Sequence, residues 1–256
     1  MQEIDFIQGY TQKHLFVSNE GIPSVLYLMD CEEGTKQIPD KFFGLAIVDP
    51  PYGINAPKMQ MGSAPNRNEK GSYPAESTAV RLKKGRLNSG GGHMKNSMLV
   101  NSDCTWDSEP PGEDYFSALI STSENQIIWG GNYFPLPPTR CMICWDKLQP
   151  WDNFSQFELA WTSFDKPTAM FRYSNTGGLN HEKKIHPTQK PVKLYEWLIR
   201  KYYAGGGIID THLGSGSNRI AAHRAKIPFM AFEKDEKHFT DSIKRFNDYS
   251  QDLTIF

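Results

Sequence analysis

The sequence has no long hydrophobic run, few cysteines and almost no net charge, and each scarcity excludes a class of protein. No apolar stretch approaches the roughly 20 residues that a membrane-spanning helix needs, so we expect no membrane partner. The amino-terminal residues lack a basic segment followed by an apolar one, which predicts the absence of a signal peptide. Four cysteines among 256 residues make no disulfide framework, which favours a cytoplasmic protein.

The composition that remains is typical of a folded α/β protein. Hydrophobic residues make up 38% of the chain and aromatic residues 12%, which excludes global disorder. Short apolar runs alternate with helical segments, so we expect a mainly parallel central sheet with helices on both faces, within one domain spanning residues 1–256. The expected strands lie at 24–29, 44–49, 126–130, 141–145, 156–161, 207–210 and 228–232. The expected helices lie at 113–123, 190–204, 217–226 and 236–249.

The formal charge of -1 is the sum of two parts of opposite sign. Residues 57–102 are polar, include three consecutive glycines, and carry eight basic against two acidic side chains, a charge of +6. The rest of the chain therefore carries -7. An insert this long without a structural pattern is either functional or disordered, and a basic one suits an anionic partner.

An acidic residue stands where a buried strand ends, in the segment Asp49-Pro50-Pro51-Tyr52. The two prolines end the strand, because neither has an amide proton and each fixes φ. The segment then lies at the carboxyl end of a strand, where open α/β sheets bind ligands. Asp49 and the Pro50 carbonyl can accept both hydrogens of an exocyclic amino group, and Tyr52 can stack on the ring that bears it. The alternative is a capped turn, which the apolar run before the segment disfavours.

This segment resembles the catalytic motif of the amino-methyltransferases, which transfer a methyl group from S-adenosyl-L-methionine to adenine N6 or cytosine N4 in DNA. The resemblance implies adenine, because the aspartate form is the one typical of adenine enzymes. It also implies catalysis by positioning and electrostatics, with no metal and no covalent intermediate. The catalytic residues that it implies are Asp49, Pro50, Pro51 and Tyr52.

A second motif joins a strand to the start of a helix through a glycine loop. Glycines let the backbone approach a ligand closely, and a helix amino terminus offers free amides. The loop is not the dinucleotide fingerprint, because Arg219 stands at its third position. It resembles the cofactor loop of the same family, which implies cofactor binding by Asp210, Gly214, Ser215 and Gly216. The usual Pro, Phe and Thr of that loop are replaced by Thr211, His212 and Ser217.

Three further segments resemble cofactor-binding parts of the family. Asp30 and Cys31 end an early strand, where the resemblance implies contact with the adenine of the cofactor. Glu233 ends the strand after the glycine loop, where an acid can accept hydrogen bonds from both ribose hydroxyls. Thr188 and Lys190 precede the loop; we expect Thr188 to cap the next helix and Lys190 to pair with the methionine carboxylate of the cofactor.

The order of the motifs, with the catalytic one first, matches the circularly permuted beta-type enzymes of the family. The resemblance covers roughly residues 20–55 and 125–245 and implies a Rossmann-like methyltransferase fold with a long basic insert. It implies site-specific methylation of adenine N6 in double-stranded DNA after base flipping, of the kind found in restriction-modification systems, in a prokaryotic or phage-type cytoplasm. The alternatives are a cytosine-N4 DNA or RNA methyltransferase and a non-catalytic DNA-binding relative. Family members often dimerise, so a homodimer is a further expectation.

The insert at 57–102 is the expected DNA-recognition surface, and the alternative is a disordered basic loop. Its expected phosphate contacts are Lys58, Arg67, Arg81, Lys83, Lys84, Arg86 and Lys95. We expect no metal site, because Cys141 and Cys144 lie in an apolar strand without a second pair. The segment 129–134 either lines the pocket for the target base or forms a turn, and 156–161 is a strand of the core.

Overall fold

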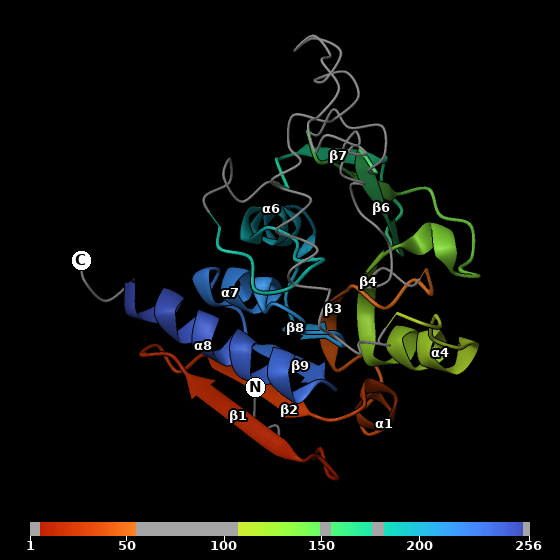
Figure 1. Cartoon of the computed structure of the whole chain (residues 1–256). Helices are drawn as coiled ribbons and strands as arrows, with labels where there is room; N and C mark the ends of the chain where they lie inside the picture. The colour runs from red at the N-terminus through yellow and green to blue at the C-terminus, as the bar shows by residue number, and fades with distance from the viewer. Residues whose placement is uncertain (1–5, 55–106, 149–154, 176–181, 253–256) are drawn as a thin grey trace, which may run out of the picture.

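The computed structural model describes residues 6–54, 107–148, 155–175 and 182–252. Their strands form one nine-stranded sheet in the order β1-β2-β9-β8-β3-β4-β6-β5-β7 (Figure 1). The strands are β1 (Gln12–Val17), β2 (Pro23–Leu28), β3 (Phe43–Val48), β4 (Ser123–Trp129), β5 (Met142–Asp146), β6 (Phe157–Thr162), β7 (Ala169–Arg172), β8 (Ile208–Asp210) and β9 (Phe229–Glu233). The helices are α1 (Cys31–Thr35), α4 (Glu113–Thr122), the 3-10 turn η3 (Gly131–Tyr133), α6 (Val192–Tyr202), α7 (Ser217–Arg224) and α8 (Glu236–Asp252).

The seven expected strands and four expected helices are all present, each within a few residues of its expected bounds. The strands β2, β9, β8, β3 and β4 pair in parallel, as expected, while β1 and β6 pair antiparallel with their neighbours. The sequence pattern missed the short elements β1, β7 and α1. The insert at 57–102, with all the expected phosphate contacts, lies outside the described residues. None of the helices in the described ranges is both long and apolar enough to span a membrane.

Side chains on the strands alternate between two apolar cores, one on each face of the sheet. On β3, Leu45 and Ile47 join the core that contains α6, α7 and α8, whereas Ala46 and Val48 join the core that contains α4. Figure 1 shows these two groups of helices on different sides of the sheet. Because both faces are covered, the strands are nearly continuous apolar runs, and the fold is the doubly wound, Rossmann-like arrangement that the sequence predicted.

The start of α6 differs from the sequence prediction. The helix begins at Val192 with Pro191 as its N-cap in an extended conformation, so the predicted cap at Thr188 is wrong. The physical reason is the proline, which disfavours a helical conformation at the residue before it, Lys190. Thr188 turns back instead, and its amide and hydroxyl contact Nδ1 of His186 at 3.3 and 3.1 Å.

Two helix ends carry residues suited to them. The glycines 205–207 after α6 have φ values of 125°, 82° and 80°, which other residues rarely adopt. The carboxylate of Asp235 accepts a hydrogen bond from the amide of His238 (2.8 Å), a capping contact at the start of α8. Cys141 is buried, and its Sγ packs 3.8 Å from the hydroxyl of Tyr202.

Candidate active site

Four neighbouring parallel strands end in an acid at the same edge of the sheet. Across the sheet these are Asp30 after β2, Glu233 at the end of β9, Asp210 at the end of β8 and Asp49 after β3. The chain continues from β3 to one side of the sheet and from β8 to the other, so the connections diverge between these two strands. Ligands of open α/β sheets bind at the carboxyl ends of strands at such a point.

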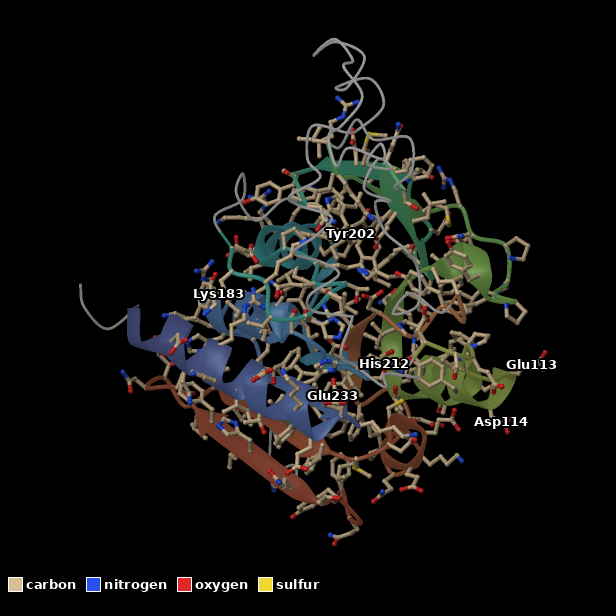
Figure 2. All side chains as sticks on the ribbon, in the orientation of Figure 1. Glu113, Asp114, Lys183, Tyr202, His212 and Glu233 are labelled. Atoms are coloured by element: carbon tan, nitrogen blue, oxygen red, sulfur yellow. The ribbon has the colours of Figure 1, made fainter. Side chains whose placement is uncertain are left out.

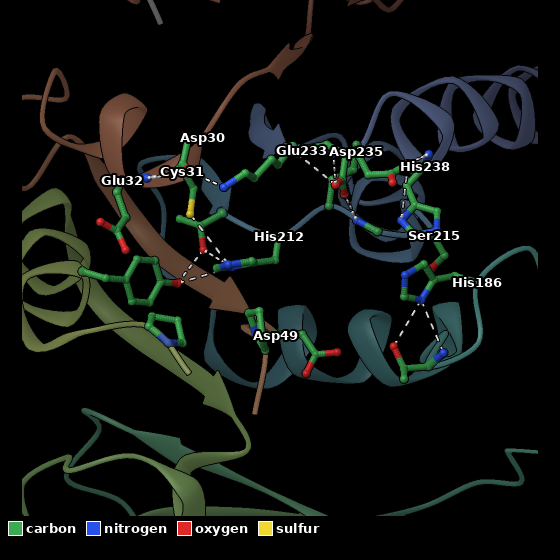
Figure 3. Close-up of a pocket in the computed structure, with 18 of the residues that line it drawn as sticks. Asp30, Cys31, Glu32, Asp49, His186, His212, Ser215, Glu233, Asp235 and His238 are labelled. Atoms are coloured by element: carbon green, nitrogen blue, oxygen red, sulfur yellow. Dashed lines mark hydrogen bonds and ion pairs between the residues drawn. The ribbon is translucent and has the colours of Figure 1, made fainter. Parts of the chain in front are cut away.

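A cavity of about 820 Å³ opens over this edge (Figure 3). Its volume lies within the range of small-molecule sites. The sequence-predicted residues on its wall are Asp30, Cys31, Asp49, Pro51, Thr188, Lys190, Gly214, Ser215 and Glu233. The remaining predicted site residues among those described, Pro50, Tyr52, Asp210 and Gly216, do not line the cavity.

The wall of the cavity is rich in acid. Six acidic side chains face two lysines there: Asp30, Glu32, Asp49, Glu109, Glu233 and Asp235 against Lys190 and Lys234. Such a wall repels phosphates and attracts cations. The arrangement therefore suits a small cationic ligand and disfavours a phosphate-bearing dinucleotide.

Asp49 is held by two side chains. Its Oδ1 accepts a hydrogen bond from the Tyr52 hydroxyl (2.7 Å), and its Oδ2 forms an ion pair with Nζ of Lys190. Nζ of Lys190 also lies 3.3 Å from the Tyr52 hydroxyl oxygen. Burial raises the pKa of Asp49, and the Lys190 ammonium opposes that rise. Each carboxylate oxygen keeps a second lone pair, so Asp49 can still accept hydrogen bonds from a ligand.

The backbone that carries Tyr52 is clamped by a residue from beyond the insert. Oδ1 of Asp107 accepts hydrogen bonds from the amides of Tyr52 (2.6 Å) and Gly53 (2.9 Å). Gly53 has a φ of 71°, and a Cβ there would lie 2.5 Å from Cδ of Pro110. No periodicity or motif points to Asp107, because it lies in an irregular polar segment of the sequence.

The ring of Tyr52 lies in a slot formed by the segment 129–134. A Cβ on Gly130 would lie 2.2 Å from the Tyr52 ring, so only glycine lets the ring approach the backbone here. Tyr133 stacks on Tyr52 with ring centroids 5.0 Å apart and an interplanar angle of 14°. The segment is therefore a turn, and that turn also borders the aromatic ring of the catalytic motif.

Lys190 has carboxylate partners within the chain. Its side chain is only 3% exposed, and Nζ lies between Asp49 and Oε2 of Glu158, which is 3.1 Å away. The other oxygen of Glu158 forms an ion pair with Lys147. This arrangement differs from the predicted pairing of Lys190 with the methionine carboxylate, since the ammonium is already shared by two acids.

Glu158 is the charged residue that the sequence analysis missed. It lies on β6 in an otherwise apolar run, Phe157–Thr162, which the sequence indicated only as a core strand. A charged side chain in such a strand needs a partner of opposite charge, and this requirement could have pointed to Glu158 from the sequence. The partner was not evident, because Lys147 and Lys190 lie 11 and 32 residues away along the chain.

The glycine loop after β8 is held from behind by Asp210. Its carboxylate accepts hydrogen bonds from the amide of His212 and from Nδ2 of Asn218, both at 3.0 Å. Burial raises the pKa of Asp210 to about 7. The same Nδ2 of Asn218 donates to the Ile47 carbonyl (3.0 Å), which ties the loop to β3. Asp210 therefore shapes the loop, while Gly214 and Ser215 reach the cavity.

Glu233 is held by backbone amides. Its Oε2 accepts from Gly214 (2.8 Å), and its Oε1 accepts from Lys234 and Asp235 (2.9 Å each). A carboxylate offers about four lone-pair positions, so these three bonds leave one on Oε2. The sequence predicted hydrogen bonds to both ribose hydroxyls, whereas the geometry leaves room for one strong bond.

His212 lies on the cavity wall near Glu233 (Figure 2). Burial lowers its pKa to about 4, so the ring is uncharged at neutral pH. Its ring stands edge-on to Tyr115, with centroids 5.5 Å apart, and its Nε2 lies 3.7 Å from Sγ of Cys31. An uncharged planar ring can make an apolar contact with a ligand in the cavity.

Asp30 joins the amino-terminal part of the wall to the end of β9. One of its carboxylate oxygens caps α1 by accepting from the amide of Glu32 (2.9 Å). The other pairs with Nζ of Lys234 (2.8 Å). These two contacts fix the carboxylate at the rim of the cavity (Figure 3).

Part of the chain that contains several of these site residues is similar to a known protein family. Residues 145–244 match the N6_N4_Mtase family, described as DNA methylase. The matched segment makes up less than half of the chain. It contains Glu158, Lys190, Asp210 and Glu233, whereas Asp49 precedes it. Enzymes of the family use S-adenosyl-L-methionine.

Two solved structures are similar in fold. The complex of M1.HpyAVI with SAM has 16% identity and a TM-score of 0.48, and the match covers 87% of this chain and 98% of that one. The cytosine-N4-specific PvuII DNA methyltransferase has 13% identity and a TM-score of 0.49, with 95% of each chain covered. A search of curated proteins gave no match.

Proposed function

We propose that the protein is a site-specific DNA methyltransferase that transfers a methyl group from S-adenosyl-L-methionine to adenine N6. The observation that carries the proposal is the position of Asp49. Its carboxylate stands between the Tyr52 hydroxyl and an acid-lined cavity, where the chain connections diverge. The match of residues 145–244 to a DNA methylase family supports DNA as the substrate.

The residues on the cavity wall fit this cofactor. S-adenosyl-L-methionine carries a sulfonium and an ammonium, and the wall has an excess of acid to receive them. The free lone pair of Glu233 suits a ribose hydroxyl, and the uncharged ring of His212 suits an apolar contact. Asp30, Gly214 and Ser215 complete the set that would hold it. When bound, the cofactor supplies an electrophilic methyl group on sulfur, which a nitrogen lone pair can take.

Asp49 acts on the amino group that receives the methyl. Its free lone pairs, with the Pro50 carbonyl, accept the two N–H bonds and hold the nitrogen in a geometry that leaves its lone pair directed outward. The nitrogen sheds one proton in the reaction, and Asp49 is the acceptor beside it. Burial, which raises the pKa of Asp49, suits it to this role.

Base flipping follows from the depth of this site. N6 of adenine is paired and stacked in a duplex, so the base must leave the helix to reach Asp49. Tyr133 is 45% exposed and covers Tyr52, so it can move outward and accept the ring between the two tyrosines. We assign the sequence-specific contacts to the basic insert at 57–102, within one domain that spans the chain.

The test is the variant Asp49→Ala with methyl transfer to duplex DNA as the measurement. We expect transfer of tritiated methyl groups to fall by about 10³-fold, because the variant loses the preorganised acceptor for the amino group. Calorimetric titration with S-adenosyl-L-methionine should give wild-type affinity. Full activity in the variant would refute the assignment of Asp49.

A further inference from the structure

Behind Asp49, charged side chains of alternating sign continue away from the cavity. Lys190 contacts Asp49 and Glu158, and Glu158 in turn contacts Lys147. The four residues come from separate segments, namely the residue after β3, the residue after β5, the start of β6 and the approach to α6. Bringing charges together with so little exposure costs desolvation energy, so this arrangement has no evident purpose in stability alone.

The charges of the four residues in the network sum to zero. Lys190 and Lys147 carry two positive charges, and Asp49 and Glu158 carry two negative ones. The lysines are buried, with exposures of 3% and 9%, whereas the carboxylates are 20% and 24% exposed. The Lys190 ammonium is therefore shared by two carboxylates of similar exposure, Asp49 and Glu158. Lys147 supplies a second positive charge beside Glu158.

Because the Lys190 ammonium is shared by two carboxylates, Asp49 is a stronger hydrogen-bond acceptor than it would be as the sole partner. An ammonium with a single carboxylate partner makes that carboxylate a weak acceptor, because its negative charge is neutralised. The negative charge of Glu158 opposes this effect and favours a raised pKa at Asp49. Glu158 itself stays ionised, because Lys190 and Lys147 hold its pKa at about 2.

We propose that Glu158 is a positioning residue which divides the charge of Lys190 and thereby keeps Asp49 available to the amino group of the target base. The inference rests on the methyl transfer proposed above, and it adds a residue outside the cavity wall to the machinery. Glu158 touches neither the cofactor nor the base in this role, since it acts through Lys190.

A test based on the pKa of Asp49 must take account of every titratable or charged group that faces it. These are Tyr52 on its own segment, Lys190, Glu158 on β6, Asp210 on β8 and Tyr195 on α6. The pKa values of both tyrosines are raised well above the ordinary value, so neither titrates in the acidic range. The pKa of Asp210 is raised to about 7, and this residue is left unchanged in every variant below.

The experiment is the pH profile of kcat/KM for DNA in Glu158→Gln. Methyl transfer needs Asp49 ionised, so the acidic limb of this profile reports its pKa. Without the charge of Glu158, the Lys190 ammonium has Asp49 as its only charged partner. The pKa of Asp49 then falls, so the acidic limb should move to lower pH by about one unit. Lys190→Met should move it to higher pH. A limb in Glu158→Gln that stays in place or moves upward would overturn the proposal.

Two further variants guard against loss of folding and against nonspecific effects. The double variant Lys147→Met/Glu158→Gln removes one charge of each sign, keeps the remainder neutral, and should move the limb downward as the single variant does. Glu196→Gln is the matched control, because Glu196 pairs with Lys193 and Arg224 on α6 and α7, away from the site. The acidic limb of Glu196→Gln should coincide with that of the wild type. The affinity for S-adenosyl-L-methionine should be unchanged in Glu158→Gln.

A second measurement separates this proposal from the proposed function. The carboxyl carbon of Asp49, labelled with ¹³C and assigned by comparison with Asp49→Asn, can be titrated by NMR without any turnover. Its pKa should fall in Glu158→Gln and rise in Lys190→Met. If the wild type transfers no methyl group to DNA yet these shifts occur, the function is wrong and the charge network stands. If transfer occurs without the shifts, the network proposal is wrong.

Discussion

Asp49 and Glu233 end parallel strands on either side of β8, yet the protein holds their carboxylates in opposite ways. Asp49 is held by the side chains of Tyr52 and Lys190. Glu233 is held by three backbone amides, those of Gly214, Lys234 and Asp235. Both carboxylates face the same cavity (Figure 3).

The difference matches the work that we assign to each residue. Backbone amides hold the carboxylate of Glu233 in a fixed position, which suits a contact that only binds. Side-chain partners with charges of their own hold Asp49, so its basicity depends on residues as distant as β6. The comparison teaches that substitutions near Asp49 should change chemistry, whereas substitutions at Glu233 should change cofactor binding.

Glu233→Gln should give the largest difference between the effect on cofactor binding and the effect on the chemical step. The new amide group would face at least one backbone N–H that now donates to the carboxylate, so we expect cofactor binding to weaken by about tenfold or more. The catalytic constant kcat at saturating cofactor should stay within about twofold of the wild type, because Asp49 is untouched. Calorimetry and steady-state rates measure the two effects.

The comparison would fail if Glu233→Gln lowered kcat while leaving the cofactor affinity intact. Asp49→Asn is the matched counterpart, since it also exchanges one carboxylate oxygen for an amide. It should show the reverse pattern, with wild-type cofactor binding and a lost chemical step.

Tyr133→Ala gives a smaller effect, confined to the catalytic side. Removal of the ring that stacks on Tyr52 should raise the KM for DNA by about fivefold to tenfold, at the lower end of the range for one base stack. Cofactor affinity should not change. Tyr133→Phe keeps the ring and should restore the wild-type KM. A KM in Tyr133→Ala equal to or below the wild-type value would show that the ring does not receive the base.

Asp210→Asn gives the smallest effect, which appears in stability. Burial raises the pKa of Asp210 to about 7, while an unfolded aspartate titrates near 3.8. The folded state therefore retains a proton that the unfolded state releases, and the free energy of unfolding falls as pH rises between about 4 and 7. The variant should show a shallower fall across this window, measured by chemical denaturation at several pH values. Equal slopes for wild type and variant would contradict the burial of an ionisable group here.

The fold was predictable from sequence because its signals are local. The apolar runs at β3, β8 and β9 and the glycines after α6 indicate the elements without reference to the rest of the chain. The strands that were missed lie at the edges of the sheet, where β1 carries exposed and half-buried side chains. Their partners, not their own sequence, define them.

The site was predictable in part, for a related reason. Asp49 and Glu233 could be found because each ends a buried strand. The partners of Asp49 could not, since Lys190 lies 141 residues away and Glu158 reaches it only through that lysine. The role predicted for Lys190 followed from its neighbours in sequence, whereas its contacts follow from the tertiary fold. Asp107 shows the same limit, because the insert separates it from the backbone that it holds.

The most direct test of the account is nucleoside analysis of duplex DNA incubated with the protein and S-adenosyl-L-methionine. After digestion, mass spectrometry separates N6-methyladenine from N4-methylcytosine. The account predicts N6-methyladenine from the wild type and none from Asp49→Ala, with equal cofactor binding by both proteins. N4-methylcytosine from the wild type, or equal methylation by Asp49→Ala, would contradict it.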